Sequence, residues 1–217
     1  MKYPNAYKGV KKLFVVQLLA VVAAILAVVA SALAAIGLKN TALVATAGSL
    51  ALSSTIVLIV VFILQLIGLH QAGKDEKLIS YAFCIAILSI LISVVGSILA
   101  SFKSVSILVT IGNVCQALAN ASGIVIAWFT LKGIAALAGR LGDSAMKKRG
   151  ETLAFYVIFF VLLSLVFEVL DAVLKGVELK WLMVTIAILA IVASIAELVV
   201  YVVTFLYYGK AVKMLKK

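Results

Sequence analysis

The sequence predicts an all-α integral membrane protein with six transmembrane helices arranged as three antiparallel hairpins. The chain of 217 residues is 66% hydrophobic and only 12% charged, which exceeds what a soluble domain of this size needs to bury. Its apolar runs are also long enough to cross a hydrocarbon core of ~30 Å, which takes about 20 helical residues. Such runs form helices because unpaired backbone groups are costly in lipid.

Six uncharged or weakly charged runs follow one another along the chain. We expect helices over residues 13–38, 41–69, 78–102, 104–131, 152–174 and 181–208. Lys39, Lys103 and Gly176 mark the short turns that make each successive pair antiparallel. The first run exceeds the ~15 residues of a signal-peptide core, so we expect it to stay in the mature chain. Residues 1–217 are thus expected to form one membrane domain.

The three predicted hairpins resemble one another. Even-numbered helices end in Leu-Ile-Gly, Leu-Lys-Gly and Leu-Tyr-Tyr-Gly, at residues 66–68, 131–133 and 206–209. Repeated hairpins of this kind occur in transporters. Basic-flanked apolar hairpins also look alike without any repeat, so a threefold hairpin repeat and chance similarity both stay open.

Fifteen of the 19 Lys and Arg residues fall on one side of the predicted membrane, at the two termini and in residues 74–77 and 132–151. By the positive-inside rule we expect a multi-pass protein of the cell membrane with both termini cytoplasmic. This basic side favours anionic lipid headgroups, and the short loops offer no platform for nucleic acid. Residues 132–141 are apolar enough to prolong the fourth helix or to lie along the interface.

Glu197 is the sharpest candidate for a functional side chain, because it interrupts the apolar run of the sixth helix. A carboxylate at the bilayer centre costs at least ~2.5 kcal/mol, so it must be protonated, paired or hydrated. It is expected either as a proton or cation site or as a protonated packing residue. Asn113, Gln116 and Asn120 share one face of the fourth helix and are candidates for solvating an ion there.

Two further acids, Glu168 and Asp171, lie toward the outer end of the fifth helix. Asp171 precedes Lys175 by four residues, a spacing that favours an ion pair on a helix. The alternative is a charged vestibule that draws cations toward the bundle.

Small residues mark the faces on which transmembrane helices approach each other closely. Such stripes consist of Ala20, Ala24, Ala27 and Ser31 on the first helix, and of Ala190 and Ser194 beside Glu197 on the sixth. We expect both stripes to face neighbouring helices.

The sequence carries no pattern of catalytic residues. The single histidine, His70, supports neither a metal site nor a catalytic triad, and Cys84 and Cys115 lack the spacing of a metal site. We therefore predict that the protein is not an enzyme and holds neither metal nor cofactor.

Three hairpins with both termini inside resemble mitochondrial carriers in topology, but the Pro-x-Asp/Glu-x-x-Lys/Arg motif of those carriers is missing, since the only proline is Pro4. The alanine-rich first helix is similar to that of the substrate-binding subunits of energy-coupling vitamin transporters, whose substrate lid needs longer outer loops. We assign the chain to no family. Its intramembrane polar residues favour a small transporter or permease-type bundle. The alternative is a structural or assembly protein, as a homo-oligomer or with a partner membrane protein.

Overall fold

The computed structural model describes residues 2–36, 41–102, 105–174 and 180–216. These residues form α1 (Pro4–Ile36), α2 (Thr41–Gly73), α3 (Lys77–Ser101), α4 (Ser106–Arg140), α5 (Ser144–Leu174) and α6 (Lys180–Lys216). Within the described residues, five helical segments are long and apolar enough to cross a membrane: Pro4–Ile36, Ala42–Gly73, Lys77–Ser101, Ser106–Arg140 and Leu198–Lys216. Their length and hydropathy support an all-α, multi-pass membrane protein.

Many large apolar side chains of these helices face outward. Val28 is 68% exposed, Ile107 71% and Leu198 63%. In water each exposed Å² of such surface forgoes about 25 cal/mol of hydrophobic stabilisation, whereas lipid tails are as apolar as the side chains themselves. A membrane is therefore the medium in which this surface is stable.

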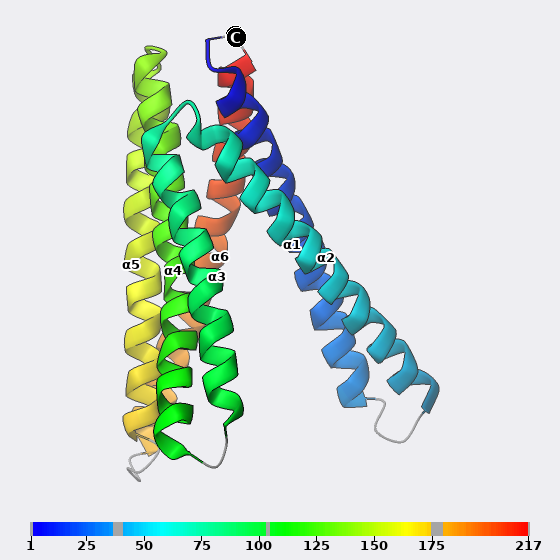
Figure 1. Ribbon diagram of the computed structural model, residues 1–217. Coiled ribbons are helices and arrows are strands. Elements are labelled where there is room, and N and C mark those ends of the chain that lie inside the picture. The colour runs from blue at the N-terminus through cyan, green and yellow to red at the C-terminus, as the bar shows by residue number, and fades with distance from the viewer. Residues whose placement is uncertain (1, 37–40, 103–104, 175–179, 217) are drawn as a thin grey trace. The chain divides into compact units, whose positions relative to one another are not determined.

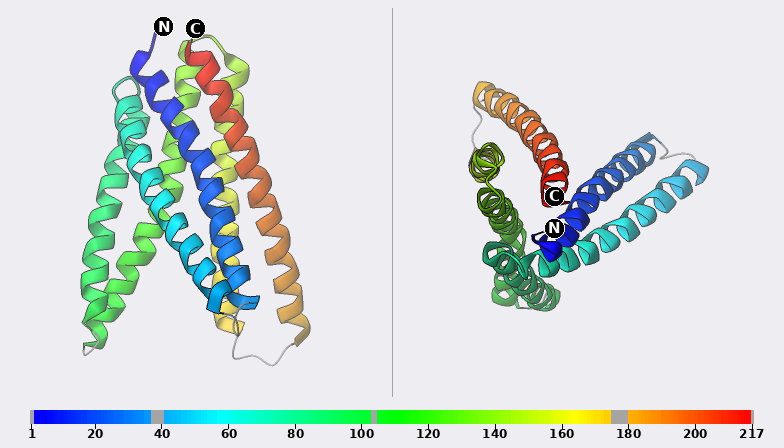
Figure 2. Two further views of the ribbon diagram at one scale, coloured as in Figure 1. Left: turned by 90° about the vertical axis from the view of Figure 1, so that its right-hand side faces the viewer. Right: turned by 90° about the horizontal axis from the view of Figure 1, so that it is seen from above.

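The chain divides into two compact units. The first comprises Met1–Asp75 and Tyr208–Lys217, and the second comprises Glu76–Tyr207. In the first unit α1 and α2 run antiparallel side by side, and in the second unit α3 and α4 do the same (Figure 1, Figure 2). α4 also packs along α5. The pairing of α5 with α6, the threefold repeat and the single membrane domain stay predictions.

The helices extend beyond the apolar runs that predicted them. α1 begins at Pro4 instead of residue 13, because proline is favoured in a first helical turn and Asp75 caps this end. The Asp75 carboxylate accepts hydrogen bonds from the Ala6 backbone N–H at 2.7 Å and from Asn5 Nδ2 at 3.0 Å. Charged residues therefore continue the helix past the lipid-embedded part.

The longest predicted connection, residues 132–151, is mostly helical. α4 continues to Arg140 and α5 begins at Ser144, so residues 132–140 prolong α4. The chain reverses at Gly142, whose φ of 79° lies in the left-handed region that glycine adopts without strain. The next residue, Asp143, caps α5 by accepting a hydrogen bond from the Met146 N–H at 2.9 Å.

The contact between α1 and α2 depends on small residues. A Cβ added at Gly9 would collide with the Gly68 carbonyl oxygen and the Ala72 backbone N–H group, so the two backbones meet there. Farther along, Ser54 Oγ donates to the Ala23 carbonyl oxygen at 3.0 Å. Ala23 is buried, as is Ala30 seven residues later. This spacing places both alanines on one helical face.

The predicted stripe on α1 lies off this contact. Ala24, Ala27 and Ser31 are exposed and Ala20 is half-buried, and the Ser31 hydroxyl donates to the Ala27 carbonyl oxygen of its own helix at 2.9 Å. Neighbouring helical residues point about 100° apart. Alanines occupy several faces of α1, and the stripe lies one residue away from the face that contacts α2. Whether it faces another helix stays a prediction.

Candidate functional site

Gln116 is the predicted site residue whose contacts the structure describes most fully. Its Nε2 donates to the Ser93 carbonyl oxygen at 2.8 Å and to Ser97 Oγ at 2.7 Å, and its Oε1 accepts from Ser93 Oγ at 3.2 Å. Both amide donors and the amide acceptor are thereby engaged by α3. Gln116 joins α4 to α3.

Glycines bring α3 and α4 close enough for these bonds. A Cβ at Gly112 would lie 2.6 Å from the Ala100 backbone nitrogen and 2.7 Å from the Gly96 carbonyl oxygen. A Cβ at Gly96 would lie 2.7 Å from Cys115 Cβ. One turn before Ser93, Ser89 Oγ donates to the Ala119 carbonyl oxygen at 3.2 Å. Close backbone approach with interhelical hydrogen bonds is how transmembrane helices associate without a hydrophobic driving force.

Asn113 and Asn120 differ from Gln116 in their exposure. Both are exposed, whereas Gln116 is half-buried against α3. The three residues were expected to act together, and the structure engages only Gln116 in the α3–α4 contact. Ala117 lies between the two asparagines on the same face and is also exposed.

The predicted acidic sites fall on residues whose side chains lie outside the described part of the structure. Glu168 and Asp171 belong to α5, and Glu197 belongs to α6. The same holds for the small residues Ala190 and Ser194 on α6. Their roles stay predictions.

The sequence did not predict an ion pair at the end of α4 that joins a buried carboxylate to a half-exposed guanidinium. Glu76 is only 3% exposed, and its Oε2 lies 2.8 Å from the Arg140 guanidinium. Its Oε1 accepts a hydrogen bond from the Leu78 N–H at 3.3 Å, which caps α3. Gly133 makes room for this end of α3, since a Cβ there would clash with Ile79 and lie 3.3 Å from Glu76 Cγ. Separated by 64 positions, these two charges carry no local signal in the sequence.

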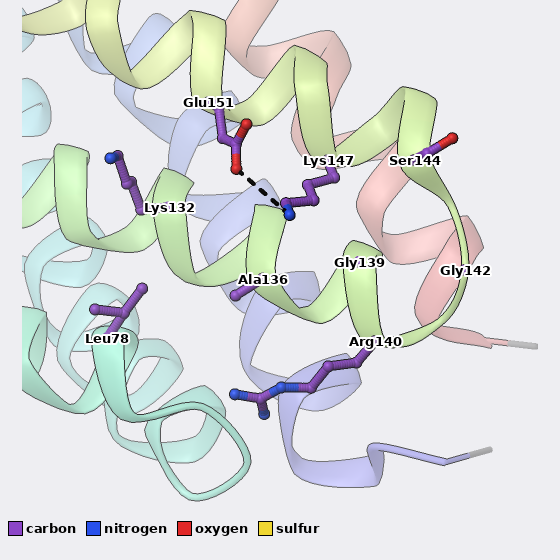
Figure 3. Close-up of a pocket in the computed structure, with 9 residues that line it drawn as sticks. All are labelled: Leu78, Lys132, Ala136, Gly139, Arg140, Gly142, Ser144, Lys147 and Glu151. Carbon is purple, nitrogen blue, oxygen red and sulfur yellow. Dashed lines mark ion pairs between the residues drawn. The ribbon is translucent and has the colours of Figure 1, made fainter.

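A pocket of about 600 Å³ opens beside this ion pair, between the end of α4 and the start of α5 (Figure 3). It is lined by Leu78, Lys132, Ala136, Gly139, Arg140, Gly142, Ser144, Lys147 and Glu151. Three of the lining residues are cations and one is an acid. The pocket is therefore a basic site formed by the second unit alone.

The charges in this pocket are only partly compensated. Lys147 Nζ lies 3.9 Å from Glu151 Oε1, and both side chains are half-exposed, so this pair contributes about 0–1 kcal/mol. Lys132 Nζ lies 5.0 Å from the centroid of the Trp128 ring, a cation–π contact that leaves its charge uncancelled. Figure 3 shows Lys147 and Glu151 directed toward each other, with the Lys132 ammonium pointing away from this pair.

The chain matches no known protein family, no curated protein and no solved structure. Among the described residues, no group of three or more His, Cys, Asp or Glu side chains is placed to hold a metal ion.

Proposed function

We propose that this protein is a structural or assembly protein of the membrane. The observation that carries the proposal is the complete engagement of the Gln116 amide by Ser93 and Ser97 of α3. A polar side chain that serves a transported ligand keeps at least one donor or acceptor directed at that ligand. Gln116 instead supplies the interhelical hydrogen bonds expected of a packing residue.

The exposed asparagines of α4 supply the surface for assembly. Asn113 and Asn120 lie well inside the apolar length of α4, where an exposed amide needs a hydrogen-bonding partner. An asparagine amide carries both donors and an acceptor, so the face can pair with the same face of a second copy about a two-fold axis. We propose a homodimer joined along this face.

Disulfide cross-linking in native membranes tests this proposal. In protein with Cys84 and Cys115 replaced by alanine, Ala117→Cys places a thiol between the two asparagines. The matched control is Ile111→Cys, which is 45% exposed on the other side of the same helix. We expect oxidation to give a covalent dimer with Ala117→Cys and none with Ile111→Cys. Equal cross-linking at both positions, or none at either, contradicts the proposed dimer.

Transport is the second candidate, and it rests on Glu197. This acid interrupts the apolar run of α6, and intramembrane acids serve as proton or cation sites in many transporters. For that function Glu168 and Asp171 would attract cations toward the bundle, and Asn113 and Asn120 would help to solvate them. Replacing Glu197 separates this candidate from the assembly function, as argued below.

A further inference from the structure

The basic pocket at the α4–α5 turn lies next to three aromatic side chains, one each on α3, α4 and α5. We call these three residues the aromatic belt. Tyr81, which is 54% exposed, follows the pocket residue Leu78 by three positions on α3. Trp128 precedes Lys132 by four positions on α4, and Phe155, which is 64% exposed, follows Glu151 by four on α5. Each aromatic residue is thus about one helical turn, roughly 5 Å, from the pocket.

The aromatic belt indicates the depth of the pocket in the membrane. The apolar lengths of α3 and α4 lie beyond the aromatic belt, on the side away from the pocket. Trp and Tyr side chains gather where a bilayer's hydrocarbon meets its headgroups. One turn farther out is the level of the lipid phosphates, so the pocket opens among lipid headgroups.

The pocket has the groups that hold a phosphate. Lys132 and Lys147 carry ammonium groups, and Ser144 adds a hydroxyl. Arg140 adds a guanidinium as the third cationic group, although the buried carboxylate of Glu76 already engages it. Glu151 is the one acid in the lining, and its distance of 3.9 Å from Lys147 Nζ leaves that ammonium open to a closer oxygen. Asp143 does not line the pocket, and its carboxylate caps α5.

We propose that this pocket binds the phosphate group of an anionic phospholipid headgroup, with Lys132 and Lys147 as its principal ligands. The lipid is favoured over a soluble phosphate because of the aromatic belt, which sets the pocket at the depth where lipid phosphates are concentrated. Basic pockets between transmembrane helices are known sites for anionic headgroups. The proposed site is independent of whether the protein assembles or transports.

The test is a lipid titration of delipidated, detergent-purified protein followed by native mass spectrometry. Dioleoyl-phosphatidylglycerol is compared with dioleoyl-phosphatidylcholine, which has the same chains and no net charge. The pocket variant is Lys132→Gln with Lys147→Gln. The control is Lys148→Gln with Arg149→Gln, two exposed neighbours outside the pocket lining that remove the same total charge. Arg140 is left in place because it compensates the buried Glu76.

We expect the parent and the control to bind phosphatidylglycerol at least tenfold more tightly than phosphatidylcholine, and the pocket variant to lose roughly that preference. Lys132→Arg with Lys147→Arg keeps both charges and should keep the preference. Melting temperatures in lipid-free detergent check that the variants fold.

Two results would overturn the proposal. One is the same phosphatidylglycerol preference in the folded pocket variant and in the control. The other is that millimolar inorganic phosphate raises the parent's melting temperature as much as phosphatidylglycerol does, which would assign the pocket to a soluble phosphate.

Discussion

The role of Glu197 depends on whether its carboxyl group stays protonated. A protonated Glu that packs against a helix offers one donor and one acceptor, and glutamine offers both at nearly the same size. A Glu that carries protons or balances a cation has to ionise, which glutamine cannot do. The two candidate functions therefore make opposite predictions for one substitution.

For the proposed assembly function we expect Glu197→Gln to keep the parent's melting temperature in detergent and its Ala117→Cys cross-link. Glu197→Leu, which removes the hydrogen bond, should melt at a lower temperature. Proton flux into liposomes loaded with a pH-sensitive dye tests the transport candidate. A flux by the parent that disappears in a stably folded Glu197→Gln protein would establish transport and displace the assembly proposal.

Single residues also mark the limit of prediction from this sequence. Gln116 was predicted to help solvate an ion, and its hydrogen-bond partners Ser93 and Ser97 depend on how α3 and α4 are aligned. That alignment is set by glycine contacts, which apolar periodicity does not encode. Lys132 and Lys147 likewise line one pocket only because the chain reverses at Gly142.

At the scale of helices, Gly112 and Gly123 form a matched pair on α4. A Cβ at Gly112 would lie within 3.0 Å of Gly96 and Ala100 atoms, whereas one at Gly123 would have no neighbour within 4 Å. Gly112→Ala therefore has to push α3 and α4 apart. Gly123→Ala only gains helix propensity.

We expect Gly112→Ala to lower stability by about 1–3 kcal/mol and Gly123→Ala to leave it unchanged or raise it by up to ~1 kcal/mol. Thermal unfolding followed by circular dichroism in detergent gives the order of the three melting temperatures. If both variants have the melting temperature of the parent, α3 and α4 do not contact each other at Gly112.

Apolar composition predicted where helices lie but not where they end. It marks only the part of a helix that lipid surrounds, and all six observed helices begin or end outside it. The actual ends follow from capping groups, such as Asp75 at α1, Glu76 at α3 and Asp143 at α5. These acids appeared in the sequence only as charges in polar segments.

The orientation of the whole molecule depends on which side of the membrane carries the basic helix ends. In the second unit, the pairing of Glu76 with Arg140 brings the start of α3 to the end of α4. Both ends belong to the side that the sequence predicts to hold 15 of the 19 Lys and Arg residues. The positive-inside rule predicts that this side is cytoplasmic, where we expect it to meet anionic lipids.

Single-cysteine labelling in intact cells tests this central claim directly. In protein without Cys84 and Cys115, cysteines replace Lys74, Lys103 or Lys147 one at a time, and a membrane-impermeant maleimide is added from outside. We predict that position 103 is labelled in intact cells, and that positions 74 and 147 are labelled only after permeabilisation. Labelling of 74 or 147 in intact cells, with 103 protected, would contradict the predicted orientation.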